Sequence, residues 1–160
     1  MKSTLPPHPL NRRGAVTVQI AFASPDVPSA ASLRKWARLA LGERTRGVVT
    51  LRVVGAAEGR RLNKGFRGRD CATNVLSFAY ETPARGRAPH GDVVLCHPVI
   101  AREASAQRKR LLRHYAHLVI HGVLHLRGMD HLRAAARQRM ERREIALLAR
   151  IGVGNPYAVE

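Results

Sequence analysis

Apolar residues recur along this chain with spacings that predict strands mainly in its first part and helices mainly in its last. Alternating or β-branched apolar runs predict strands over residues 16–22, 48–54, 74–80 and 92–96. Apolar residues three and four apart predict helices over residues 29–41, 56–65, 98–107, 109–127 and 132–151. Runs of strands followed by helices are typical of an α+β fold, which is the fold class we expect.

Two of these helices have clear apolar faces. The first can be capped by Ser29 or Ser32. Its apolar face consists of Leu33, Trp36, Ala37, Ala40 and Leu41. On the last helix the shared face consists of Ala136, Met140, Leu147 and Ile151. We expect both faces to lie against the core.

A chain of 160 residues is expected to form one domain. We place this domain at residues 14–160, after a loose, proline-rich and basic arm at residues 1–13. Prolines interrupt the arm where a signal peptide has its apolar core, and no apolar run reaches the ~18 residues of a membrane span. We therefore expect a cytoplasmic protein with no membrane partner.

Cys71 and Cys96 are too few for a disulfide framework, and we interpret both as small packing residues.

The run from His121 to His131 carries three histidines around a glycine. His121 and His125 are four residues apart, so on a helix they lie about 40° apart around the axis and roughly 6 Å apart along it, facing one point. Gly128 can adopt the left-handed conformation that ends a helix and lets the chain return His131 to the same point. Three protein ligands with one open position are typical of catalytic zinc. We predict one Zn²⁺ ion held by His121, His125 and His131.

The same spacing occurs in the metzincin metalloprotease motif H-E-x-x-H-x-x-G-x-x-H, with one difference. The protease places its general base, a glutamate, directly after the first histidine, and here that position is Gly122. The ligand set is therefore present while the protease base is absent. Two neighbours leave alternatives open. His117 can point to the metal, support a ligand or belong to the core, and Asp130 can orient a ligand ring or cap the last helix.

Charge is the second strong feature of the sequence. The chain carries 28 Lys+Arg against 11 Asp+Glu, a formal net charge of +17. This balance predicts attraction to a polyanion with salt-sensitive affinity, although a high-GC genome that favours arginine also explains part of it. A membrane surface is less favoured because no isolated basic amphipathic helix with large apolar anchors is present. Aromatic residues make up only 4%, so we expect RNA recognition through backbone and shape rather than base stacking.

Several segments together resemble the YbeY family of bacterial ribosomal-RNA maturation endoribonucleases. Residues 121–131 match its signature H-G-x-L-H-L-x-G-x-D-H. Residues 62–70 resemble its L-N-x-x-[YF]-R-G-x-D, and residues 73–78 resemble its T-[ND]-V-L-S-F. Further matches are Gly91-Asp92, Ala116-His117 and Asn155-Pro156-Tyr157. The matches span roughly residues 50 to 157, which makes the resemblance specific.

The resemblance implies a small mixed β-sheet of about four strands with helices packed on it. It carries zinc ligation over onto His121, His125 and His131, and a catalytic role onto Arg67. It implies a single-strand-specific endoribonuclease in ribosomal RNA maturation and small-subunit quality control. The expected partners are ribosomal RNA and the small ribosomal subunit with its proteins, and no organic cofactor is expected.

The chain departs from the family pattern at four positions. Ala72 stands where proline is usual, Met129 where tyrosine is common, and Arg133 and Arg137 where acidic residues often occur. None of these is a proposed ligand. They affect the shape of the rim of the site, so the family pattern does not determine the substrate preference of this chain.

Metal-assisted phosphodiester cleavage is the chemistry we expect. Zinc can acidify a water molecule or polarise a phosphoryl oxygen, and a guanidinium such as that of Arg67 stabilises the charge that develops on phosphoryl oxygens. Without the family resemblance, we would interpret Arg67 as one of many solvated arginines on the surface. Two alternatives are a non-catalytic, zinc-stabilised RNA-binding ribosome-assembly factor and a metallopeptidase.

Overall fold

The computed structural model of this protein describes residues 14–81 and 88–158. The elements follow in the order β1 (Ala15–Ile20), α1 (Ala30–Leu41), β2 (Val48–Val54), α2 (Ala56–Arg67), β3 (Val75–Ala79), β4 (His90–Cys96), α3 (His97–Ala106), α4 (Leu111–Leu126) and α5 (Ala134–Ala149). The arm predicted at residues 1–13 lies outside the described residues. In the described part, no helix is long and apolar enough to cross a membrane.

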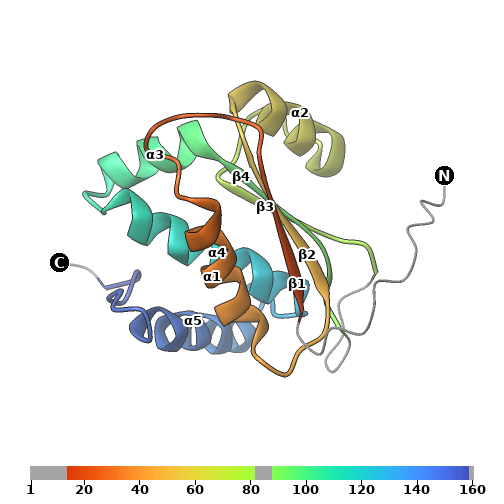
Figure 1. The fold of residues 1–160 in the computed structure, drawn as a ribbon, viewed down its shortest axis with the longest axis vertical. Helices are drawn as coiled ribbons and strands as arrows, with labels where there is room; N and C mark the ends of the chain where they lie inside the picture. Colours follow the sequence, from red (N-terminus) through yellow and green to blue (C-terminus); the bar gives the residue numbers. More distant parts are fainter. Residues whose placement is uncertain (1–13, 82–87, 159–160) are drawn as a thin grey trace.

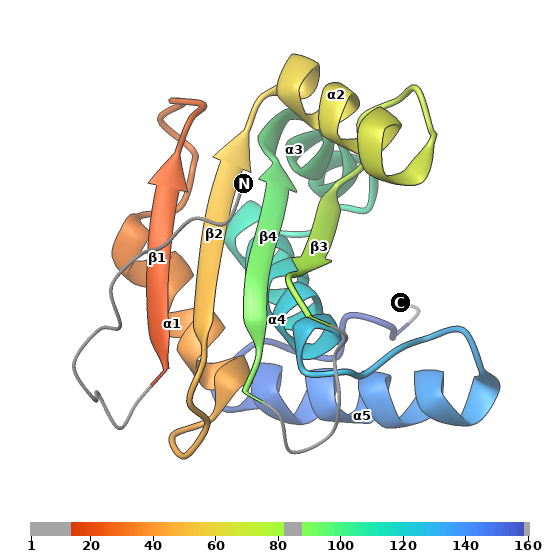
Figure 2. The same ribbon diagram turned by 90° about the vertical axis from the view of Figure 1, so that its right-hand side faces the viewer.

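The four strands form one mixed sheet in the order β1-β2-β4-β3. The three strands β1, β2 and β4 are parallel, and β3 joins the edge antiparallel to β4. Figure 1 shows α1, α4 and α5 on one side of the sheet and α2 on the other, while Figure 2 shows the sheet face-on with α5 crossing beneath it. The α+β class and the mixed sheet of about four strands are therefore confirmed.

Each predicted element is present with ends shifted by a few residues, and local capping explains the shifts at α1 and α2. Ser29 is the residue that caps α1, because its hydroxyl accepts the backbone N–H of Ser32 at 3.1 Å. The helix predicted to end at residue 65 continues to Arg67, since the first left-handed residue is Gly68 with φ 67°. Arg67 thus lies on the last turn of a helix, so the helix defines the position of its backbone.

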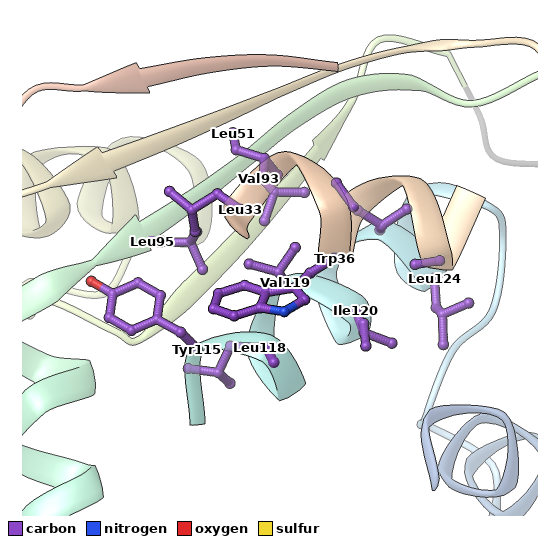
Figure 3. Close-up of a cluster of buried hydrophobic side chains, with 14 of the residues drawn as sticks. Leu33, Trp36, Leu51, Val93, Leu95, Tyr115, Leu118, Val119, Ile120 and Leu124 are labelled. Carbon is purple, nitrogen blue, oxygen red and sulfur yellow. The ribbon is translucent and has the colours of Figure 1, made fainter. Parts of the chain in front are cut away.

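The main core lies between the sheet and the helices α1 and α4. Figure 3 shows Leu33 and Trp36 of α1 together with Val119 and other α4 side chains, packed below strand residues such as Leu51. All five residues of the apolar face predicted for α1 are buried. Of the face predicted for the last helix, Met140 and Leu147 are fully buried and Ala136 is half-buried, while Ile151 is half-buried beyond the end of α5 at Ala149. The amphipathic patterns were therefore correct indicators of packing.

Of the two predicted packing cysteines, only one is buried. Cys96 lies in the small cluster on the α2 side of the sheet. Cys71 is exposed, so the packing role predicted for it is wrong. It lies in the loop after α2, where its carbonyl oxygen accepts a hydrogen bond from the Asn63 amide at 2.7 Å. The backbone of this position, rather than its side chain, contributes to the fold.

Gly122 lets α4 lie close against the sheet. A Cβ at this position would stand 2.6 Å from Val93 Cγ1 and 3.2 Å from Ser77 Oγ. The Ser77 hydroxyl donates a hydrogen bond to the Gly122 carbonyl at 2.9 Å, which ties α4 to β3. The position directly after His121 therefore faces the sheet. A glutamate there, as in the metalloproteases, would collide with the sheet instead of reaching the histidines.

Substitution of Gly122 by alanine is expected to lower the free energy of unfolding by about 1–3 kcal/mol, because the added methyl overpacks the contact with β4. Gly65→Ala is the matched control, since Gly65 is also inside a helix but has nothing within 4 Å of the added Cβ. That control is expected to be stabilising by up to about 1 kcal/mol through helix propensity. Chemical denaturation measures both changes. Equal responses would contradict the close approach of α4 to the sheet.

Candidate metal centre

The end of α4 and the turn after it bring three histidine rings together. His121 and His125 lie on the last two turns of α4. Gly128 is left-handed with φ 90°, and the N–H groups of Gly128 and Met129 donate back to the carbonyls of His125 and Leu124 at 3.0 and 3.1 Å. This pair of bonds is the Schellman arrangement that ends a helix and reverses the chain. His131 follows the reversal and returns to the other two rings.

The ring nitrogens converge closely enough to bind one ion. His121 Nε2 lies 3.1 Å from His125 Nε2, and His131 Nδ1 lies 3.0 Å from the same His125 atom. Nitrogen ligands at ~2.0–2.1 Å around a tetrahedral zinc lie about 3.3 Å from one another. The observed spacing therefore fits a single zinc-sized cation.

The central ring of the cluster is held neutral. Burial, together with the nearby charges of His121 and His131, lowers the pKa of His125 to about 4. At neutral pH this imidazole is therefore uncharged, and one of its two ring nitrogens has a free lone pair. Metal ligation requires the neutral ring, so the environment of His125 suits a ligand.

A carboxylate that the sequence pattern did not indicate contacts this cluster. Glu144 of α5 is fully buried and lies on the same helix face as Met140 and Leu147. Its Oε1 accepts a hydrogen bond from His121 Nδ1 at 2.5 Å. Because Nδ1 carries the proton, Nε2 of His121 is free to act as a ligand. The missed signal was a glutamate at a core position of an otherwise apolar helix face.

The second oxygen of Glu144 accepts two further hydrogen bonds. His117 Nε2 donates to Oε2 at 3.0 Å, and the Tyr157 hydroxyl donates to the same atom. Burial alone would raise the pKa of Glu144, but the hydrogen bonds from His117, His121 and Tyr157 lower it to about 2. Glu144 is therefore an anion at neutral pH and links His117 to His121.

The described residues contain two overlapping groups that can hold a cation. One is His121, His125 and His131, and the other is His117, His121 and Glu144. In the second group, both oxygens of Glu144 are already engaged by histidine and tyrosine protons. In the first group, the hydrogen bonds of the described residues join the converging nitrogens only to one another, so a single cation can replace these contacts and we favour the three histidines. In this arrangement, His117 supports a ligand through Glu144, one of the alternatives left open by the sequence.

The carboxylate of Asp130 forms a hydrogen bond with the local backbone. Its Oδ1 accepts the backbone N–H of Leu132 at 3.1 Å, which shapes the short turn before α5. Among the described residues, no hydrogen bond joins Asp130 to His131 or to the other two rings. The N-cap position of α5 is Arg133 and no side chain caps it, so Asp130 fulfils neither of the two predicted roles and instead stabilises the turn before the helix.

Arg67 and the three histidines line one cavity of about 330 Å³. Arg67 reaches it from the last turn of α2, and Thr73, Asn74 and Ser77 line it from β3 and the loop before it. Asn74 is held in place because its amide donates to Glu103 Oε2 at 3.0 Å, and His114 Nε2 contacts the same carboxylate oxygen at 2.9 Å. One wall of the cavity is thus tied to both α3 and α4. The cavity therefore brings a permanently charged cationic group and a candidate metal-binding cluster to the same open space.

Glu144→Gln is expected to weaken metal binding about 10–100-fold, since partners that orient a metal ligand typically contribute this much. A neutral amide can accept from only one of the two rings, because its NH₂ group faces the other donor. Metal affinity is measured by competition with a chromophoric chelator. Glu141→Gln is the control, since Glu141 lies on the same helix and its ion pair is with the exposed Arg137 at 3.7 Å. An unchanged affinity for Glu144→Gln would contradict the orienting role.

Comparisons with known proteins extend over most of the chain. A family model described as Endoribonuclease YbeY matches residues 26–152. A Bordetella pertussis protein named Endoribonuclease YbeY is 50% identical over 151 residues, covering 89% of this chain and 95% of that protein. A Stenotrophomonas maltophilia protein of the same name is 47% identical over 158 residues, covering 92% and 98%. The solution structure of TM1509 from Thermotoga maritima matches with a TM-score of 0.53 at 18% identity, covering 90% of this chain and 99% of that one. This last likeness concerns the fold alone.

Proposed function

This chain belongs to the YbeY endoribonuclease family, and from this premise we propose that it is a zinc-dependent, single-strand-specific endoribonuclease of ribosomal RNA. The observation that carries the proposal is the shared cavity of His121, His125, His131 and Arg67. Three imidazole nitrogens suit one divalent cation, and the guanidinium suits a phosphate. Together they provide the two kinds of group that phosphodiester cleavage needs.

The chemistry divides between the metal and the side chains of the chain. A bound zinc supplies a Lewis acid that can acidify water or polarise a phosphoryl oxygen. Glu144 holds the His121 ring with its proton on Nδ1, and the burial of His125 keeps that ring neutral. Arg67 faces the cavity with a permanent positive charge, which stabilises the negative charge that grows on the phosphoryl oxygens.

A metallopeptidase is the less favoured alternative. The glutamate that activates water in these proteases would have to stand at position 122, where the residue is a buried glycine facing β4. Among the described residues that line the cavity with the histidines, none is acidic. A cavity with arginine but without a carboxylate base suits phosphate better than a peptide bond.

The proposed partners are ribosomal RNA and the small ribosomal subunit, in a role in RNA maturation and subunit quality control. The net charge of +17 supports a polyanionic partner. A cytoplasmic location is part of the proposal, and the two unpaired cysteines are consistent with a reducing compartment.

The test is cleavage of a labelled single-stranded RNA by the full chain, first as purified, then after chelation, and then after zinc is restored. We expect cleavage that chelation abolishes and zinc restores, with little cleavage of the duplex form and none of casein. Restored metal binding without RNA cleavage would replace the proposal with the non-catalytic assembly factor. Cleavage of casein but not RNA would replace it with the metallopeptidase.

A further inference from the structure

A second and larger cavity lies on the other side of the turn that carries His131. Its volume is about 920 Å³, and five arginines line it. They come from three parts of the chain: the segment after α1, the end of α4, and α5. We call this cavity the arginine cleft; its arginines are Arg44, Arg46, Arg127, Arg139 and Arg143.

Among the described residues that line the cleft, five arginines face a single carboxylate, that of Asp130. Elsewhere, Arg52 and Arg60 form close ion pairs with Glu58 and Asp70 at 2.8 and 2.7 Å. In the described ranges, no ion pair involves any arginine of the cleft. The carboxylate that lines the cleft, Asp130, instead accepts a backbone hydrogen bond. The cleft therefore concentrates uncompensated positive charge that an anion would relieve.

Arg127 forms a fixed point in this cleft. Its Nη1 donates to the Ala40 carbonyl at 2.8 Å, which holds the partly buried guanidinium between α1 and α4. Arg127 and Arg143 line the cleft together, close enough for their positive charges to act on each other. Arg139 and Arg143 are four residues apart on α5, so they project from the same helix face beside Arg127. The guanidinium groups thus share one surface.

The cleft and the metal centre share a wall. Leu126 and His131 line the metal cavity, while the residues between them, from Arg127 to Asp130, line the arginine cleft. Because adjacent residues line the two cavities, an extended strand that left the metal centre over this turn would reach the cleft. The described lining contains no aromatic side chain, so it offers contacts to phosphates and no stacking platform for bases.

We propose that the arginine cleft is a second RNA subsite, which holds backbone phosphates of the strand that flanks the scissile bond. The inference rests on the proposed function and adds to it where the substrate lies beyond the metal centre. Arginine forks bind phosphate oxygens in a bidentate manner, and several such contacts along a strand give binding that depends on charge rather than on base sequence.

The test removes two cleft arginines and measures backbone binding apart from cleavage. The metal-loaded full chain is titrated with a labelled single-stranded DNA oligomer, which carries the phosphate backbone without the 2′-hydroxyl. R139A/R143A is expected to weaken binding about tenfold and to reduce the slope of log Kd against log salt by about 1.4, since each single-strand phosphate contact contributes ~0.7. For RNA of the same sequence, KM should rise with kcat unchanged, as loss of uniform binding requires.

Two further variants separate the cleft from general charge effects. R113A/R142A removes the same charge from exposed arginines that line neither cavity and is expected to change the Kd less than twofold. R139K/R143K keeps the charge and is expected to recover most of the salt slope but only part of the affinity. Circular dichroism and the melting temperature verify that each variant is folded.

Several results would overturn the subsite. One is an equal loss of binding in R139A/R143A and R113A/R142A, which would mean that only net charge matters. Another is saturable binding of inorganic phosphate that R139A/R143A abolishes while the oligomer slope stays the same, which would mean a site for a small free anion. Failure of the proposed function has a different signature: the wild type would not cleave RNA, while the loss of oligomer binding in R139A/R143A would remain.

Discussion

His125→Ala is expected to abolish stoichiometric metal binding and RNA cleavage together. His125 is the central member of the cluster, because its Nε2 lies within 3.1 Å of ring nitrogens from both His121 and His131. Even a residue that only orients a ligand contributes about 10–100-fold to metal affinity, so loss of the central ligand should cost more than about 100-fold. Metal content after gel filtration and cleavage of labelled RNA measure the two effects.

Two companion variants sharpen this result. His90→Ala removes an exposed histidine at the start of β4 and should leave both metal content and cleavage unchanged. His117→Ala distinguishes the two candidate ligand groups: if the three histidines are the ligands, it retains one metal per chain at reduced affinity. Full metal occupancy in His125→Ala, or complete loss in His117→Ala, would favour the group that contains Glu144.

Arg67→Ala is expected to reduce RNA cleavage by about 10²–10³-fold, the usual cost of removing one preorganised group that stabilises transition-state charge. Arg67 lines the cavity of the three histidines but is exposed at the end of α2, so metal affinity and stability should stay near those of the wild type. The loss should fall on kcat, since the developing charge is greatest in the transition state. Single-turnover cleavage with saturating enzyme measures it.

Control variants around Arg67 test charge and geometry separately. Arg61→Ala removes an exposed arginine of the same helix that approaches only Glu58, at 3.8 Å, and should leave cleavage unchanged. Arg67→Lys keeps the charge without the planar fork and should recover part of the rate. If Arg67→Ala cleaves as fast as Arg61→Ala, then Arg67 is one solvated arginine among many.

The sequence was enough to predict the histidine cluster at residues 121–131, but it was not enough to predict the contact between Glu144 and His121. The histidine cluster is local: its members lie within one helix end and one turn, whose geometry follows from helical periodicity and the left-handed Gly128. Glu144 lies 23 positions after His121, and only the packing of α5 on α4 brings the two side chains together. In the sequence alone, Glu144 is one of several polar residues on a helix, and nothing indicates that it is buried against His121.

The position of Arg67 required both kinds of information. Its residue type and place in the chain gave the family resemblance, but spacing alone did not distinguish it from many solvated arginines. Its approach to the histidines depends on α2 lying across the sheet and ending at Gly68, and on β3 joining the edge of the sheet beside α4. The cavity is made by elements that are separate in sequence.

By itself, the sequence determined the helices and strands, the inward faces of α1 and α5, the metal-binding spacing and the family. Each of these depends on residues a few positions apart, or on motifs whose order along the chain is enough to identify them. The tertiary structure alone decided that β3 runs antiparallel at the sheet edge, that Gly122 excludes a protease base, that Glu144 orients His121, and that five distant arginines line one cleft. These outcomes depend on which segments, distant in the sequence, pack together. The periodicity of one segment shows which of its faces is apolar, but it does not identify the segment that packs on that face.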